Sequence, residues 1–150
     1  MQEKTVKMRD IILQGEEILQ LIPQRAPIVM VDKFYGVDDN FSYSGLTIRP
    51  DNIFCQLNHF VEVGLIEHIA QSAAARVGYV YAQKGEPVPL GFIGSIDKFK
   101  LHKAALVGNE LYTEIEVLQE IGDITLISAK TSVSEELIAE CRMKIFLKKE

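Results

Sequence analysis

The stretch that decides the fold runs from Val63 to Ala82 and reads VGLIEHIAQSAAARVGYVYA. Nearly every position in it is apolar or small, and the side chains expected to carry full charge are Glu67 and Arg76. A helix that is apolar all round is buried, either inside a protein or in a membrane. Because this one also carries a histidine, a glutamine and a serine, we expect a sheet wrapped around it rather than lipid.

The flanking sequence supplies the strands of that sheet. Residues 15–22 have apolar side chains at helical spacing and predict a short helix that ends at Pro23. Gly85 is expected to end the long helix. Segments rich in β-branched and aromatic residues, separated by turn residues, predict strands at 28–37, 41–48, 91–101, 109–120, 124–134 and 137–147. Runs of strands gathered around one helix predict an α+β fold with an antiparallel sheet of about six strands.

Length, charge and motif spacing exclude several classes of protein. At 150 residues the chain fits a single domain, 1–150, with residues 1–14 as a loosely packed N-terminal extension. The net charge of −5 argues against a nucleic-acid surface, and the absence of an apolar run at the start predicts a cytoplasmic protein. Cys55, Cys141 and the three histidines lack metal-ligand spacing, so we expect reduced thiols, no metal and no cofactor.

Three further stretches form a recognisable set. They are residues 21–32, LIPQRAPIVMVD; His59-Phe60 with residues 67–73, EHIAQSA; and residues 94–100, GSIDKFK, with Val107-Gly108-Asn109. Together they resemble motifs of the hotdog-fold 3-hydroxyacyl-acyl-carrier-protein dehydratases: Leu-Leu-Pro-His-Arg, Gly-His-Phe-Pro, Glu-Ala-[apolar]-Ala-Gln and Pro-Gly-Asp. The likeness spans about residues 16–147 and looks closest to the divergent dehydratase-like proteins of aryl-polyene-type clusters.

The resemblance implies a hotdog fold, a homodimer and chemistry on acyl thioesters. In such dehydratases a base removes the C2 proton, an acid protonates the leaving hydroxyl, and donors hold the thioester oxygen. By resemblance His59 is the base and Glu67 the acid. The backbone amides of Val63, Gly64 and Leu65 would face the carbonyl, and Gln71 completes the substrate-binding set. The family builds each site from two chains, with histidine from one and glutamate from the other.

Departures from the family pattern leave other functions open. Gln24 replaces a histidine of the motifs, and the family's Gly-x-Pro-x-Met-Pro-Gly element is absent, which favours a non-catalytic partner that binds acyl carrier protein beside an active homologue; Asn58 also replaces a motif glycine. An acyl thioesterase, with Glu67 as base for water, is a third possibility. Without catalysis, His59 would be a helix-start residue behind an Asn58 cap, and Glu67 a carboxylate bonded to Gln71 one turn away.

Four basic residues are candidates for binding the carrier protein. Arg25, Lys98, Lys100 and Lys103 could form a basic rim for an acidic carrier protein despite the negative net charge, because local patches can steer partners. Ordinary solvated strand ends explain them equally well. The sequence leaves open whether the acyl group is carried on acyl carrier protein or on coenzyme A.

Overall fold

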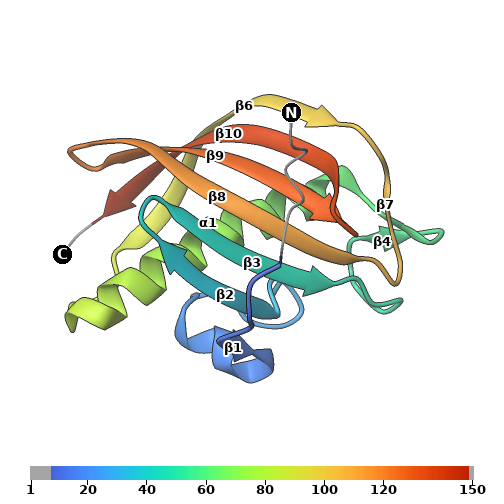
Figure 1. The fold of residues 1–150 in the computed structure, drawn as a ribbon, viewed down its shortest axis with the longest axis horizontal. Coiled ribbons are helices and arrows are strands. Elements are labelled where there is room, and N and C mark those ends of the chain that lie inside the picture. Colours follow the sequence, from blue (N-terminus) through green and yellow to red (C-terminus); the bar gives the residue numbers. More distant parts are fainter. Residues whose placement is uncertain (1–7, 149–150) are drawn as a thin grey trace, which may run out of the picture.

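The fold is organised around one long helix, as the sequence predicts. The computed structural model describes residues 8–148, in which α1 spans Glu62–Lys84. A curved sheet wraps around α1, with its strands crossing over the helix (Figure 1). A smaller sheet of short strands lies near the N-terminal end of α1.

The other elements follow the order expected from the sequence. They are β1 (Leu13–Gln14), the 3-10 helix η1 (Gly15–Gln20), β2 (Lys33–Asp38), β3 (Phe41–Thr47), β4 (Cys55–Gln56), β5 (His59–Phe60), β6 (Leu90–Leu101), β7 (Ala105–Leu106), β8 (Glu110–Ile121), β9 (Ile124–Val133) and β10 (Glu136–Lys148). The large sheet has the order β1-β2-β3-β8-β9-β10-β6, and every neighbouring pair in it is antiparallel. This is the hotdog arrangement. Five of the six predicted strands lie close to their predicted ranges, and the first, β2, begins later than predicted.

Apolar residues of α1 build the core against the concave face of the sheet. Ile69 and Ala73 pack in one cluster with inward-facing residues of β8, β9 and β10, such as Ile115 and Ile127. Near the end of the helix, Gly78 lies so close to the chain before β2 that a Cβ there would collide with the backbone of Leu21. The helix ends at Gly85, whose φ of 68° is the left-handed conformation that glycine adopts without strain.

The first strand begins later than its composition suggests. Residues 28–37 are rich in strand-forming side chains, but β2 starts only at Lys33. The backbone of residues 28–30 is bonded instead to side chains of α1: Gln71 contacts Ile28 and Met30, and His68 contacts Met30. A strand propensity is overridden here because tertiary hydrogen bonds satisfy the same backbone groups.

The N-terminal region also differs from expectation. The predicted helix at 15–22 is a 3-10 helix that ends at Gln20. Residues 1–7 of the expected loose extension lie outside the described residues, whereas Leu13 and Gln14 pair with Phe34 and Lys33 as β1.

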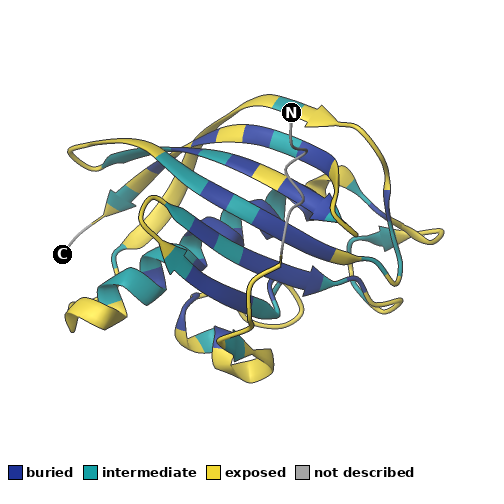
Figure 2. Cartoon of the chain, in the orientation of Figure 1, coloured by how far each residue is buried: buried dark blue, intermediate teal, exposed yellow. Residues whose placement is uncertain are grey.

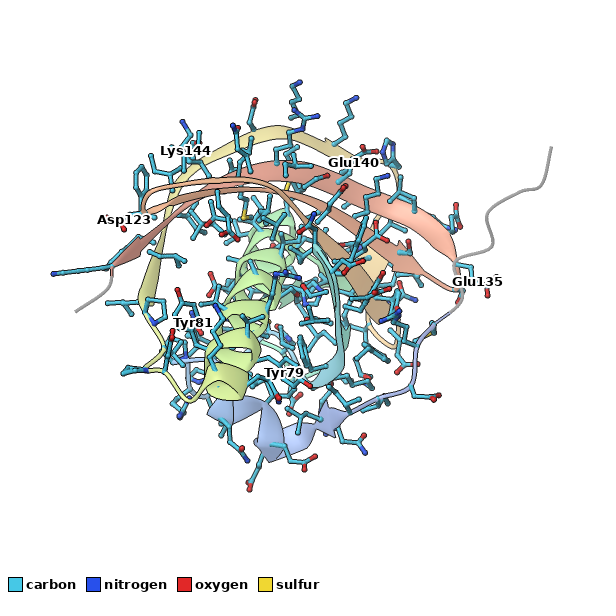
Figure 3. All side chains as sticks on the ribbon, turned by 60° about the vertical axis from the view of Figure 1, so that its left-hand side comes forward. Tyr79, Tyr81, Asp123, Glu135, Glu140 and Lys144 are labelled. Carbon is cyan, nitrogen blue, oxygen red and sulfur yellow. The ribbon has the colours of Figure 1, made fainter. Side chains whose placement is uncertain are left out.

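Burial divides the sheet into a covered face and an exposed edge. The middle strands carry buried residues, whereas β6, at one end of the strand order, is exposed over most of its length (Figure 2). Figure 3 shows side chains filling the space between α1 and the sheet that curves around it. The apolar side chains left exposed on β6 are Leu90, Phe92, Ile93, Ile96 and Leu101.

Candidate active site

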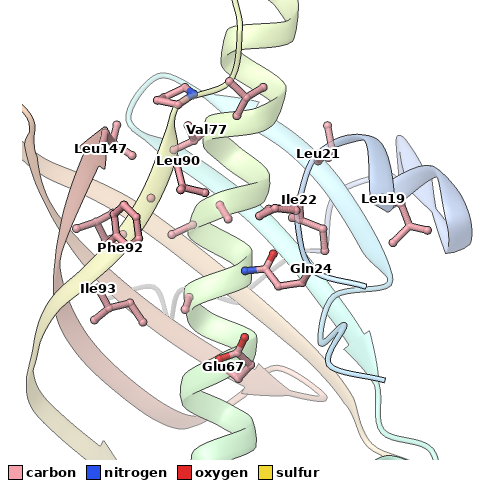
Figure 4. Close-up of a pocket in the computed structure, with 18 of the residues that line it drawn as sticks. Leu19, Leu21, Ile22, Gln24, Glu67, Val77, Leu90, Phe92, Ile93 and Leu147 are labelled. Atoms are coloured by element: carbon pink, nitrogen blue, oxygen red, sulfur yellow. The ribbon is translucent and has the colours of Figure 1, made fainter. Parts of the chain in front are cut away.

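A cavity of about 590 Å³ opens beside α1. Residues 19–25 form one side, and the start of β6 with the end of β10 forms the other (Figure 4). Most of its wall is apolar. The lining residues are Leu19, Gln20, Leu21, Ile22, Pro23, Gln24, Arg25, Glu67, Ala70, Ala73, Ala74, Val77, Val88, Pro89, Leu90, Gly91, Phe92, Ile93, Ile145 and Leu147.

The helix side of the cavity is a row of small residues with one carboxylate. Glu67, Ala70, Ala74 and Val77 are spaced by three or four positions, so they share one face of α1. Small side chains on that face leave the space that larger residues would fill. The alanine run therefore has two roles, since Ala73 and Ala74 line the cavity while Ala75 is buried in the core.

Glu67 is the only acidic side chain among the described residues of the cavity wall, and it is half-buried. Its Oε1 accepts a hydrogen bond of 2.8 Å from Gln71 Nε2, one turn along the helix. A carboxylate in an apolar wall is costly unless it is bonded or used in chemistry. The bond to Gln71 satisfies one of its oxygens and fixes the direction of the carboxyl group.

Gln71 is itself held firmly. Its Oε1 accepts from the Met30 N–H at 2.6 Å, and its Nε2 donates to the Ile28 carbonyl at 2.8 Å as well as to Glu67. The side chain is fully buried. Gln71 thus ties the chain before β2 to the carboxylate in the cavity.

His68 points away from the cavity into the opposite packing layer. It is fully buried, and its ring nitrogens lie 2.6 Å from the Met30 carbonyl oxygen and 2.7 Å from Thr113 Oγ1. Burial lowers the pKa of His68 from its ordinary 6.5 to about 4, against smaller raising effects of the Met30 hydrogen bond and of Asp32. The imidazole is therefore neutral at physiological pH.

The structure does not bring His59 to Glu67. His59 lies on β5, is exposed, and its Nδ1 is 3.1 Å from the Leu57 carbonyl oxygen. It is absent from the cavity wall that contains Glu67. The expected Asn58 cap is wrong, because Asn58 has a φ of 71° and α1 is capped at Val61.

The amides expected to hold the thioester oxygen are only partly available. The N–H groups of Gly64 and Leu65 both donate to the Val61 carbonyl, at 2.9 and 3.2 Å, which corrects the expectation for these two residues. Leu65 packs in the core, and Gly64 lies against Phe54 and Phe60. Val63, near the helix start, is 62% exposed, and N–H groups in a first turn lack intrahelical partners. None of the three lines the cavity.

The basic residues divide into two places. Arg25 lies in the cavity wall. Its guanidinium donates to the backbone carbonyls of Ile22, Gln24 and Leu19, all in the segment that leads up to it. Lys98, Lys100 and Lys103 follow one another at the far end of β6 and beyond it. Acidic side chains accompany them, since Lys103 pairs with Glu136 at 3.1 Å.

The sequence marks Gln24 as a departure from the family motif but does not indicate the surroundings of its side chain. Gln24 lines the cavity with a buried Oε1 that has no hydrogen-bond partner within residues 8–148. Thr113 and Thr131 were also not identified. Their spacing could have indicated that they face inward, because each lies two residues along its strand from a buried apolar residue, Ile115 on β8 and Ala129 on β9. In the described ranges, no His, Cys, Asp or Glu cluster could hold a metal, and no helix is long and apolar enough to cross a membrane.

Comparison with known proteins finds a family match over nearly the whole chain. A family model described as ApeP-like, ApeP dehydratase, matches residues 16–150. A protein of Desulfotalea psychrophila named 3-hydroxyacyl-[acyl-carrier-protein] dehydratase FabZ is 28% identical over 145 residues, which cover 91% of this chain and 97% of that protein.

Solved structures share the fold at lower identity. The dehydratase heterocomplex ApeI:P from Xenorhabdus doucetiae matches with a TM-score of 0.81 and 18% identity, covering 89% of this chain and 91% of that one. A hypothetical thioesterase with coenzyme A from Streptococcus pneumoniae matches with a TM-score of 0.63 and 8% identity, covering 78% and 85%. At these identities the likeness establishes the fold alone.

Proposed function

The chain belongs to the ApeP-like dehydratase family, and from that premise we propose that it removes water from 3-hydroxyacyl thioesters to give 2,3-unsaturated thioesters. The observation that carries the proposal is Glu67. It is the one carboxylate that the described residues place in the wall of an apolar cavity, and its orientation is set by Gln71. The thioester would be carried on acyl carrier protein or coenzyme A.

Glu67 has the chemistry required of the acid. As the C2–H bond breaks, its electron pair forms the C2=C3 double bond and expels the C3 hydroxyl. Glu67 donates a proton to that hydroxyl, which leaves as water. Because Gln71 donates to Oε1, the other carboxyl oxygen is the one that faces no competing donor within the described chain.

The cavity suits the acyl chain of such a thioester. From Glu67 to Val77 the lining face of α1 extends ten residues, or about 15 Å at 1.5 Å per residue. Leu90, Phe92 and Leu147 from the sheet close the opposite side (Figure 4). We therefore assign the apolar part of the cavity to the acyl tail and the Glu67 end to the reacting carbons.

His59 is proposed as the base that removes the C2 proton, at a site completed by a second hotdog chain. The support is its position: it lies outside the cavity of its own chain, between Leu57, 96% exposed, and Val63, 62% exposed. Contact with a second chain would cover these two exposed apolar side chains. Since β6 is also an exposed, partly apolar edge strand, assembly with another hotdog chain would cover both regions.

The proposed function is tested by assaying the purified chain with 3-hydroxyacyl thioesters from four carbons upward, on carrier protein and on coenzyme A. The expected product is the conjugated thioester, with Glu67→Gln lowering kcat by roughly 10³-fold or more. Glu62→Gln is the matched control, because Glu62 is an exposed residue of the same helix and should leave the rate unchanged. Release of free thiol without dehydration would instead identify a thioesterase.

A second candidate function is a partner subunit that contributes only part of a site. The specific observation is the separation of His59 from the cavity, together with Gln24 in place of the motif histidine. In this case the chain alone would be inactive, and dehydration would appear only on mixing with a second hotdog dehydratase chain. Equal activity of the chain alone and of the mixture would exclude this alternative.

A further inference from the structure

Two sets of hydrogen bonds, joined by the backbone of Met30, lead from the inner face of the sheet to Glu67. The first starts at Thr131, whose Oγ1 is 2.7 Å from Thr113 Oγ1, and continues to His68 Nε2 at 2.7 Å. His68 Nδ1 contacts the Met30 carbonyl, and the N–H of the same residue contacts Gln71. Gln71 Nε2 then reaches Glu67. Two strands, the segment before β2 and α1 are thereby connected to a single carboxyl group.

The Met30 carbonyl determines which atom donates in each hydrogen bond of His68, Thr113 and Thr131. The Met30 carbonyl can only accept, so His68 Nδ1 carries the proton and donates. In the neutral ring Nε2 must then accept, so the Thr113 hydroxyl donates to it. Thr113 has no second proton, so Thr131 donates to Thr113. The tautomer of His68 is therefore fixed by its partners.

The glutamine side is determined in the same way. The Met30 N–H can only donate, which places Gln71 Oε1 next to it. The Ile28 carbonyl can only accept, which places Nε2 on the other side, and the second Nε2 hydrogen is left for Glu67. A flipped amide would lose all three bonds. The backbone at Met30 thus links the orientation of His68 to that of Gln71.

Four polar side chains of the two sets are fully buried: His68, Gln71, Thr113 and Thr131. Away from water an unpartnered polar group is costly, so the two sets have one favourable arrangement rather than several. Where the related dehydratase motif has Ala beside its glutamate, this chain has His68. That substitution introduces the ring that holds the Met30 carbonyl in place.

We propose that His68 is a positioning residue for the dehydration, acting through the backbone of Met30 and through Gln71 to hold the Glu67 carboxyl in its reactive orientation. The proposal rests on the proposed function of Glu67. The backbone of the segment before β2 then connects the buried His68 to Glu67, the candidate acid. His68 itself does not contact the cavity.

A histidine that only fills the core would give a different result from a positioning residue. His68→Leu removes both ring bonds, whereas His68→Asn retains a side-chain N–H near the position of Nδ1. Loss of orientation should lower kcat by on the order of tenfold or more with little change in KM, because small misplacements of a reacting group are costly. His68→Asn should recover most of that loss.

Ser72→Ala is the matched control. Ser72 is a fully buried polar residue of the same helix whose Oγ donates to the His68 carbonyl at 2.8 Å, outside the two sets that lead to Glu67. It should lower stability without lowering kcat. If His68→Leu leaves kcat unchanged, or if His68→Asn is no better than His68→Leu, the proposal is overturned.

A second readout separates this proposal from the proposed function. The side-chain NH₂ signals of Gln71 and the hydrogen exchange of the Met30 N–H can be followed by NMR without substrate. We expect slow exchange at both sites in the wild type, Ser72→Ala and His68→Asn, and faster exchange in His68→Leu. An inactive wild type that shows this pattern would refute the dehydratase assignment and not the positioning; unchanged exchange in His68→Leu would refute the positioning.

Discussion

Glu67 and His59, the two candidate catalytic side chains, lie in opposite surroundings. Glu67 is half-buried on a helix that passes through the core, and it is tied by Gln71 to the chain before β2. His59 is exposed on a two-residue strand and bonds to the carbonyl of Leu57, two residues away. The surroundings of Glu67 are thus supplied by this chain, whereas His59 has no enclosing residues among those described.

This difference suits the two roles proposed for these residues. As the proposed general acid, Glu67 needs a fixed orientation, which its hydrogen bond to the buried Gln71 supplies. The histidine lies beside apolar side chains that solvent now contacts, such as Leu57 and Val63. Contact with a second chain would cover those residues and exclude water from His59. Three experiments on the two surroundings and on the cavity follow, in order of decreasing effect.

The largest effect is expected for His59. If a second chain makes it the base, His59→Ala should lower kcat by roughly 10³-fold, within the range usual for general base catalysis. Its thermal stability should barely change, because the side chain is exposed. His102→Ala is the control: His102 is also exposed and is bonded to Glu140 at the far end of β6. Equal activity of both variants would remove His59 from the site.

The protonation state of the buried His68 should affect the stability of the fold. Burial holds the pKa of His68 at about 4, below its ordinary 6.5, so between these values the unfolded chain binds more protons than the folded one. Stability contributed by the neutral ring is present above pH 6.5 and is lost as the pH falls toward 4. At about 1.4 kcal/mol per unit, the loss totals about 3 kcal/mol.

Denaturant unfolding across that pH range measures this loss. His68→Leu should flatten the slope of unfolding free energy against pH, whereas His59→Ala should retain it. An unchanged slope in His68→Leu would mean that carboxylates elsewhere account for the acid sensitivity.

A smaller effect concerns the far end of the cavity. Val77→Trp should fill the space that a long acyl tail needs, lowering kcat/KM for long-chain substrates by about tenfold while four-carbon substrates react normally. Val80→Trp, on the same helix but outside this cavity, serves as the control. Equal losses for both substrate lengths would place the tail elsewhere.

The sequence predicted the elements better than the connections between them. The buried helix and its Gly85 end could be read directly, since a 20-residue apolar stretch and a glycine stop are local signals. The hairpin and four C-terminal strands were likewise predicted from composition and turn residues. What failed was the segment before Lys33, where side chains from α1 take the backbone hydrogen bonds that a strand would use.

For the candidate site, the sequence indicated which residues to examine but not their environment. Glu67 was identified as a carboxylate on an apolar helix, and its bond to Gln71 was anticipated from their spacing of four. The Thr113 and Thr131 contacts were not, because they join residues more than 40 positions from His68. The amides of Gly64 and Leu65 were misjudged because the helix start at Val61 is set by tertiary structure.

The central claim is that each active site takes His59 from one chain and Glu67 from another, and subunit complementation tests it most directly. Glu67→Gln and His59→Ala chains, each inactive alone, are unfolded together and refolded as a mixture. In a symmetric dimer, random mixing makes half the molecules heterodimers with one intact site in two, so activity should return to about a quarter of wild type. A mixture as inactive as its components would contradict the claim.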